Sequence, residues 1–288
     1  MNRGNGGGNV FGTILLIIIL VGGFFYVKSI EGGLPAVLDK VSGGLSSALG
    51  GDGNGSKDGK STGSNSYDPL TFVSVEGKAE AISSPELDQE KGEIKYYGLD
   101  DMGRSKGFKA FISRDMYLKE KNEKREPITK NPPGWKGHNR EVTILYKDKA
   151  YHGWFYNRSH LLADSLGGSP DMENMVTGTR MQNVGWNDNA GGMGYMENKI
   201  RKFLAKKENQ DCSVYYSAKP DYESDELVPR TVTLNARSCD REIDEKVVVY
   251  NVAPGYIIDY SSGSFRKDPD YDPNPQESAE PEKPEANS

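Results

Sequence analysis

The chain has 288 residues, of which 35% are hydrophobic and 49 are glycine or proline (34 and 15), so only part of it can form a packed core. The formal net charge is −6. Residues 268–288 alone hold seven acidic residues and one lysine, which gives the same net −6, so the rest of the chain is close to neutral. A protein that coats nucleic acid through a uniformly basic surface is therefore excluded, and any anion-binding site must be a local patch.

Cysteine and histidine are scarce. The two cysteines, Cys212 and Cys239, exclude a four-cysteine zinc site and a disulfide-rich miniprotein. Three histidines (His138, His152 and His160) argue against a metal centre built from several imidazoles.

Near the N-terminus, residues 10–27 (VFGTILLIIILVGGFFYV) form an uncharged run of 18 residues between Arg3 and Lys28. A helix of this length can span a bilayer core of about 30 Å. The alternative is a cleaved signal peptide, whose apolar run is usually shorter and ends at a small-residue cleavage site. This run ends in two phenylalanines and a tyrosine, which suit a membrane interface. We expect an uncleaved single-pass anchor in the cell membrane, with the following domain outside. Cleavage would instead give a secreted protein.

Composition divides the chain into four parts. Residues 1–30 form the anchor with a short cytoplasmic end, and residues 31–66 form a tether in which positions 42–66 hold eight glycines and seven serines. Residues 67–267 are long enough for a single core. Residues 268–288, with five prolines and the acidic excess, are expected to be a disordered tail.

Within the folded part, two β-rich runs at 142–146 and 151–156 predict a hairpin. The stretch 164–189 is rich in Gly, Asn and Asp and predicts a long functional loop. Apolar residues at helical spacing predict an amphipathic, basic helix over 195–207. Three strands are then expected at 213–218, 231–236 and 246–251. The fold class expected from this order is α+β.

The two cysteines flank the first two of these three strands, since Cys212 opens one and Cys239 follows the next. If the strands are antiparallel neighbours, both cysteines lie at one end of the pair. Spacing alone leaves a disulfide and two free thiols equally open. The export signal in front of the domain favours the disulfide.

The residues that carry chemistry gather in one region: Asn157-Arg158-Ser159-His160, then Asn174, Asn183 and Glu197, next to the basic helix. A phosphodiesterase needs a neutral imidazole to take a proton from water, a hard cation held by oxygen ligands, and guanidinium groups for the phosphate. The region offers each of these, and its amide oxygens fit an Asn–water magnesium site better than a carboxylate-bridged metal pair. Taken singly, each residue also has a structural explanation, such as a turn asparagine or a solvated basic helix face.

The segment NRSHLLADSLGG…ENMVTGTRMQN…GGMGYMENKI resembles the DNA/RNA non-specific endonuclease family, the ββα-metal nucleases with a DRGH-type motif. The resemblance extends from about Tyr67 to Arg266, through LVPRTVTLN and VVVYNVAPGYIIDY, and is greatest to membrane-anchored DNA-entry nucleases and streptodornases. It implies a ββα-metal core on a central antiparallel sheet. It also implies cleavage of DNA, with RNA as a second substrate, using Mg²⁺ or alternatively Mn²⁺ and no small-molecule cofactor.

The resemblance also implies roles for individual residues. His160 would be the general base, Asn183 the single protein ligand of the cation, and Glu197 the acid that supports the hydrated metal. Arg201, one helical turn after Glu197, would reach the scissile phosphate. Asn174 would have a supporting role.

The chain departs from the motif at two positions, because Asn157 replaces Asp and Ser159 replaces Gly, while Arg158 is the motif arginine. The first change removes a charge that would orient a metal-bound water, although an amide still accepts the hydrogen bond. With His160 and Asn183 both present, we expect an active nuclease. A catalytically inactive surface DNA-binding module is the alternative, and an adhesin on a Gly/Ser stalk is a third hypothesis.

Overall fold

The computed structural model describes residues 20–21, 24–25, 67–80, 92–135 and 137–275. The chain divides into two compact units, Met1–Lys60 and Ser61–Ser288. In the first unit, β1 (Leu20–Val21) pairs antiparallel with β2 (Phe24–Phe25). These residues lie inside the predicted membrane span at 10–27, and the rest of that span lies outside the described residues. In the described part of the chain, no helix is long and apolar enough to cross a membrane.

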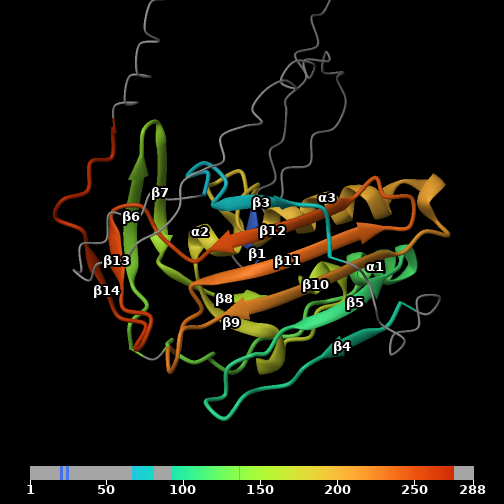
Figure 1. Cartoon of the computed structure of the whole chain (residues 1–288), viewed down its shortest axis with the longest axis horizontal. Helices are drawn as coiled ribbons and strands as arrows, with labels where there is room; N and C mark the ends of the chain where they lie inside the picture. The colour runs from blue at the N-terminus through green and yellow to red at the C-terminus, as the bar shows by residue number, and fades with distance from the viewer. Residues whose placement is uncertain (1–19, 22–23, 26–66, 81–91, 136, 276–288) are drawn as a thin grey trace, which may run out of the picture. The chain divides into compact units, whose positions relative to one another are not determined.

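The second unit is built on a six-stranded antiparallel sheet (Figure 1). The order is β3-β12-β11-β10-β5-β4, with bounds Val73–Gly77, Asp244–Tyr250, Thr231–Ser238, Val214–Asp221, Phe108–Ile112 and Ile94–Tyr96. In β10, burial alternates along the strand, so one face of the sheet is turned to the core. The three predicted strands at 213–218, 231–236 and 246–251 are therefore confirmed as the neighbours β10, β11 and β12.

The predicted basic helix is α3, Met193–Ala205, which runs along one face of the sheet (Figure 1). Its apolar residues are buried against the sheet in the larger hydrophobic core, as the periodicity predicted: Met196, Ile200, Phe203 and Leu204. A one-turn 3-10 helix follows at Lys207–Asn209. The side chain of Asn209 donates to the carbonyl of Phe203 at 3.0 Å and so satisfies one of the open carbonyls at the end of α3. Helix α1 (Arg114–Asn122) is capped at its N-terminus by Ser113, whose hydroxyl accepts from the backbone of Met116.

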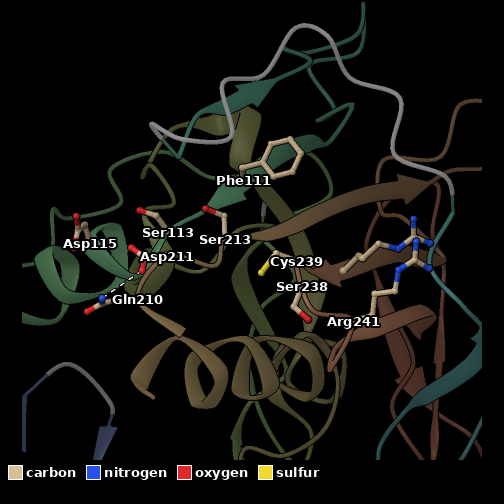
Figure 2. A pocket seen from close by; sticks show the side chains of 10 residues that line it. Phe111, Ser113, Asp115, Gln210, Asp211, Ser213, Ser238, Cys239 and Arg241 are labelled. Carbon is tan, nitrogen blue, oxygen red and sulfur yellow. Dashed lines mark hydrogen bonds between the residues drawn. The ribbon is translucent and has the colours of Figure 1, made fainter. Parts of the chain in front are cut away.

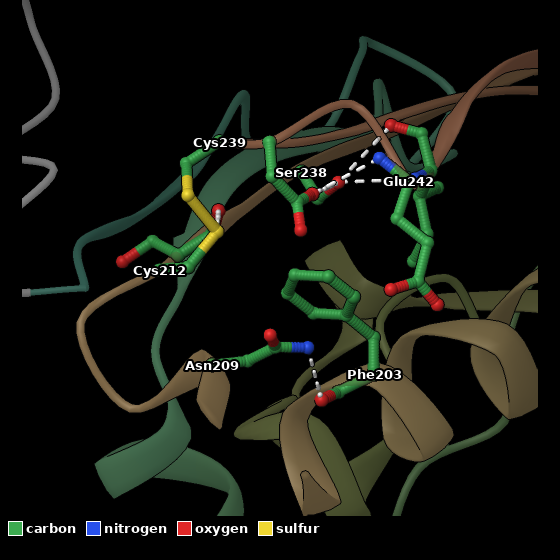
Figure 3. Close-up of a disulfide and its surroundings, with 9 residues drawn as sticks. Phe203, Asn209, Cys212, Ser238, Cys239 and Glu242 are labelled. Atoms are coloured by element: carbon green, nitrogen blue, oxygen red, sulfur yellow. Dashed lines mark hydrogen bonds between the residues drawn. A yellow bond between two sulfur atoms is a disulfide. The ribbon is translucent and has the colours of Figure 1, made fainter. Parts of the chain in front are cut away.

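The disulfide joins Cys212, two residues before the start of β10, to Cys239, the residue after β11 (Figure 3). Because these strands are antiparallel neighbours, with Val214 opposite Ser238, the two Cα atoms lie only 5.5 Å apart. The predicted pairing is confirmed.

The predicted hairpin is β6 (Glu141–Tyr146) with β7 (Lys149–Trp154), closed by a two-residue turn. The prediction of the second strand, 151–156, was wrong at its C-terminal end. β7 stops at Trp154, and a separate strand, β8 (Tyr156–His160), begins after buried Phe155. Phe155 stacks on Phe265 with ring centroids 3.6 Å apart, in a second hydrophobic core. Phe265 lies in β14 (Phe265–Lys267), which pairs with β13 (Tyr256–Ile258).

The predicted long loop at 164–189 is instead largely regular. It contains two 3-10 turns (Asp164–Leu166 and Met172–Asn174), the strand β9 (Met175–Thr179) and the short helix α2 (Arg180–Val184). β9 pairs antiparallel with β8. All five residues of β9 are buried, so the strand shows no alternation of apolar and polar residues that the sequence could reveal. The strands β8 and β9 followed by α2 and α3 form the ββα arrangement.

The first part of the predicted tail belongs to the folded unit. Tyr271 donates its hydroxyl to the carbonyl of Leu145 at 2.8 Å, and the backbone of Lys147 donates to Pro273 at 2.6 Å. Residues 268–275 therefore lie against the β6–β7 hairpin. Residues 276–288 lie outside the described residues.

Candidate active site

His160 is the last residue of β8, where its backbone lies opposite Met175 of β9. Burial lowers the pKa of the imidazole from 6.5 to about 4, and the nearby positive charge of Arg125 acts in the same direction. The ring is therefore neutral across the physiological pH range. A neutral imidazole can accept a proton, which is the property a general base requires.

Asn183 lies in α2, directly across from the motif strand. Its side-chain oxygen Oδ1 accepts a hydrogen bond from the hydroxyl of Ser159 at 3.1 Å. The helix begins at Thr179, whose hydroxyl accepts from the backbone of Gln182 at 3.0 Å, a cap that fixes its first turn. A hydrogen bond therefore links Asn183, the predicted cation ligand, to Ser159, which precedes the predicted base His160.

Glu197 lies in the first half of α3 and is buried, with 7% of its surface exposed. Burial raises the pKa of its carboxyl to about 7, and the positive charge of Arg201 only partly opposes this. Nη1 of Arg201 lies 3.6 Å from Oε2 of Glu197. An enclosed carboxyl with a raised pKa is costly to ionise unless a cation is added to its surroundings.

Arg201 is held by two further contacts. Its Nη1 donates to the hydroxyl of Ser165 at 2.9 Å, and its Nη2 donates to Oδ1 of Asn198 at 2.7 Å. The guanidinium therefore ties α3 to the turn that follows the motif strand. It remains partly exposed, at 28% of its side-chain surface.

Asn174 is completely buried and bonds only to backbone groups. Its Oδ1 accepts from the amide of Leu162 at 2.8 Å, while its Nδ2 donates to the carbonyls of Leu162 at 2.9 Å and Ser169 at 2.8 Å. These bonds fix the chain as it leaves His160. The geometry is that of a supporting residue with no atom directed to a substrate.

Arg158 lies in the middle of β8, and its side chain is anchored at the surface. Nε donates to Oδ1 of Asn131 at 2.7 Å, and the guanidinium lies 5.0 Å from the ring centre of Trp135. Asn157, the preceding residue, is partly buried and lies opposite Gly178 of β9.

The structure adds two residues that sequence reasoning missed, Arg125 and Asp164. Their ion pair spans 2.9 Å, and both line a hollow of about 240 Å³ together with Arg201 and Ser165. Arg125 follows α1 in a polar segment without a motif, so no pattern in the sequence connected it with His160.

Another hollow lies away from these residues. One of about 650 Å³ beside the disulfide is lined by polar side chains that include Asp115, Asp211 and Arg241 (Figure 2). It contains none of the predicted site residues.

The side chains around the candidate site decide which kind of metal ion they could bind. In the described ranges, no three His, Cys, Asp or Glu residues group closely enough to hold a metal ion. Asn183 lies in α2 and Glu197 in the next helix, α3, and both carry side-chain oxygens of the kind that hard cations such as Mg²⁺ bind.

A sequence model described as DNA/RNA non-specific endonuclease matches residues 85–240, more than half of the chain. The chain belongs to the DNA/RNA non-specific endonuclease family. The family match covers β8, β9, α2 and α3, and so includes every residue of the candidate site.

Relatives of this endonuclease family agree in fold. The chain is 32% identical over 235 residues to a deoxyribonuclease of Streptococcus dysgalactiae subsp. equisimilis, covering 70% of this chain and 71% of that protein. The solved structure of Sda1 nuclease with a bound zinc ion matches with a TM-score of 0.63 and 33% identity, over 69% of this chain and 98% of that one. NucA from Streptococcus agalactiae with a bound magnesium ion shares the fold at 21% identity, with a TM-score of 0.51 over 66% of this chain and 84% of that one.

Proposed function

We propose that this endonuclease hydrolyses phosphodiester bonds of DNA, and of RNA as a second substrate, without sequence preference and with a divalent cation, Mg²⁺ or Mn²⁺. The observation that carries the proposal is the place of His160 at the end of β8, next to Ser159, which donates a hydrogen bond to Asn183. Burial of the imidazole, which lowers its pKa, supports the role of a base. The bound zinc of Sda1 nuclease and the bound magnesium of NucA support a divalent cation.

In this reaction an imidazole nitrogen of His160 takes a proton from the attacking water. The water oxygen forms a bond to phosphorus while the bond from phosphorus to the 3′-oxygen breaks. The leaving 3′-oxygen takes a proton from a solvent water, so the products carry a 5′-phosphate and a 3′-hydroxyl, and the imidazolium returns its proton to solvent. A divalent cation, when bound, neutralises the charge that develops on the phosphate.

The remaining site residues bind and orient. The Asn183 oxygen would hold the cation, and the buried carboxyl of Glu197 would accept hydrogen bonds from the water around it. Arg201, which the sequence predicted to reach the phosphate, is fixed beside Ser165 with part of its surface exposed. Contacts to phosphates alone give affinity without reading bases, which agrees with cleavage at any sequence.

Plasmid cleavage by the full chain tests the proposal, with Mg²⁺, with EDTA, and with the variant His160→Ala. We expect nicking that needs Mg²⁺ and falls by about 10²- to 10⁴-fold in the variant, the usual contribution of a general base. His152→Ala is the matched control, because His152 is exposed on β7 and bonds only to Thr143. Intact plasmid that still shifts on a gel would refute the enzyme and leave a DNA-binding module.

The proposal includes a place of action, outside the cell membrane, with residues 10–27 as the anchor. The support is the uncharged run of 18 residues followed by the Gly/Ser-rich tether. We expect the full chain in the membrane fraction and a chain lacking residues 1–30 in the soluble fraction. Protease added to intact cells should remove a C-terminal epitope from the full chain. Protection of that epitope would contradict the orientation, and release of the full chain into the medium would indicate cleavage.

A further inference from the structure

The hydroxyl of Ser159 is completely buried and donates to Oδ1 of Asn183 at 3.1 Å, while Asn183 itself is only half-buried. We infer that Ser159 is a positioning residue that holds the amide oxygen of Asn183 in the orientation needed to bind the divalent cation. The inference rests on the proposed function, because it assigns a role toward the cation of that same site.

Gly178, in β9, lies between the side chain of Ser159 and that of Gln182 in α2. At Gly178 of β9, a Cβ atom would lie 2.7 Å from Cβ of Ser159 and 1.9 Å from Oε1 of Gln182. Only glycine leaves space for both neighbours. The next residue, Thr179, caps α2. Gly178 and Thr179 together therefore bring the first turn of α2 within hydrogen-bond reach of the Ser159 side chain.

The geometry leaves Asn183 able to bind a cation. A side-chain carbonyl oxygen has two lone pairs, and the hydrogen bond from Ser159 uses one of them. The second remains for a metal ion. A half-buried asparagine without this bond would rotate among several conformers, and only some of them would direct the oxygen to the ion. The bond reduces the conformational entropy that is lost when the cation binds.

The Ser159 hydroxyl is a hydrogen-bond donor that the DRGH-type motif does not have at this position. The DRGH-type pattern has glycine where this sequence has Ser159, and glycine has no side chain that could donate. The serine is therefore an additional contact to the cation ligand, in the same motif where the loss of Asp at position 157 removes a charge.

Magnesium binding to the full chain, measured by calorimetry with Mg²⁺ alone, tests the inference separately from catalysis. Loss of one hydrogen bond of about 1 kcal/mol predicts a roughly five- to tenfold higher Kd in Ser159→Ala. The Mg²⁺ concentration for half-maximal plasmid cleavage should rise by the same factor, while the rate at saturating Mg²⁺ recovers. In an Asn183→Ala background, the same substitution should have no further effect on magnesium binding.

Ser238→Ala is the matched control. Ser238 is equally buried, at 2% exposure, and its hydroxyl bonds to Asp240 and Ile243 at the far end of β11. Its loss should lower the melting temperature and leave the Kd for Mg²⁺ unchanged. If Ser159→Ala behaves in the same way, the role of Ser159 is only structural and the inference is refuted.

Two further outcomes are distinguishable. If Ser159→Ala does not fold, Ser159→Cys keeps a side chain of similar size with a much weaker donor, and it should show the same rise in Kd. An unchanged Kd in that variant overturns the inference. If the unmodified chain neither binds Mg²⁺ nor cleaves DNA, the proposed function itself fails, whereas cleavage with an unchanged Kd in the variants refutes only the role of Ser159.

Discussion

Oε2 of Glu197 lies 3.6 Å from Nη1 of Arg201, one turn further along α3, yet the pKa of the carboxyl is raised to about 7. The cost of burying the charge therefore exceeds the gain from the ion pair. A bound cation would supply the positive charge that the ionised carboxylate of Glu197 lacks. Without the cation, the ionisation of Glu197 should make the stability of the fold depend on pH.

The first prediction concerns stability. The folded state binds the proton of Glu197 more tightly than the unfolded chain does. The folding stability that comes from this protonated carboxyl is therefore fully present below the unfolded pKa of 4.5 and is lost as the pH rises through about 7. In EDTA, Glu197→Gln should therefore melt at a higher temperature than the unmodified chain at pH 8, with a gain of up to about 3 kcal/mol. The gain should shrink to about 1 kcal/mol at pH 5, where the folded carboxyl is mostly protonated, and nearly vanish at pH 4, below the unfolded pKa.

Glu245→Gln is the control for this prediction. Its carboxylate pairs with Lys199 at 2.7 Å on the partly exposed side of α3, so its loss should bring no stabilisation at pH 8. Plasmid cleavage measured separately, with Mg²⁺ and without EDTA, should fall in Glu197→Gln, since a stabilising change at a strained site commonly costs activity. Equal melting temperatures of Glu197→Gln and the unmodified chain at pH 8 would show that burial does not disfavour the charge.

Most of the scaffold could be predicted from the sequence, because its signals are local. In α3, apolar residues recur at helical spacing, and the observed bounds differ from the expected ones by two residues at each end. The strands β10, β11 and β12 are long and rich in β-branched or aromatic residues. The disulfide followed from the order of these strands together with the predicted export signal.

The parts that could not be predicted depend on contacts distant in sequence. β9 is buried on both faces and carries one glycine and two threonines in MVTGT, so it lacks the period of a half-exposed strand. The six-stranded sheet also includes β4 and β5, which pair with each other and, through β5, with β10, more than 100 residues away. No local pattern specifies such a register.

The candidate site also contains residues that the sequence could predict and contacts that it could not. His160, Asn183 and Glu197 were predicted because they belong to a recognisable motif. The charge of Arg125 near His160, and the bond from Ser159 to Asn183, arise only when β8, α2 and the segment after α1 come together. From the sequence alone, Ser159 is only a departure from the motif, because its partner Asn183 lies 24 residues further along the chain.

The second prediction concerns the titration of His160. Burial and Arg125 lower its pKa to about 4, so its ring signals in NMR spectra should keep the neutral chemical shift down to about pH 5. The signals are assigned by their loss in His160→Ala. In Arg125→Ala the pKa should move upward, toward 6.5, because a nearby positive charge is removed. Titration of His160 near 6.5 in the unmodified chain would disagree with a buried neutral base.

The third prediction concerns the disulfide, which closes a segment with a sequence separation of 27. Closing a loop of this size stabilises the fold by roughly 3 to 4 kcal/mol through the reduced entropy of the unfolded chain. The double variant Cys212→Ser, Cys239→Ser should therefore unfold at a clearly lower denaturant concentration. Its rate of plasmid cleavage at 25 °C should stay close to that of the unmodified chain, because neither cysteine contacts the candidate site.

Reduction of the unmodified chain by dithiothreitol should lower its unfolding midpoint to that of the double variant, and the reagent should not affect the double variant. The two cysteines hold the ends of β10 and β11 together beside Asn209 and the end of α3 (Figure 3). Loss of the bond should therefore loosen this end of the sheet first, with faster hydrogen exchange at Ser213 and Ser238 than at His160. A large loss of cleavage with an unchanged unfolding midpoint would mean that the disulfide acts on the site itself.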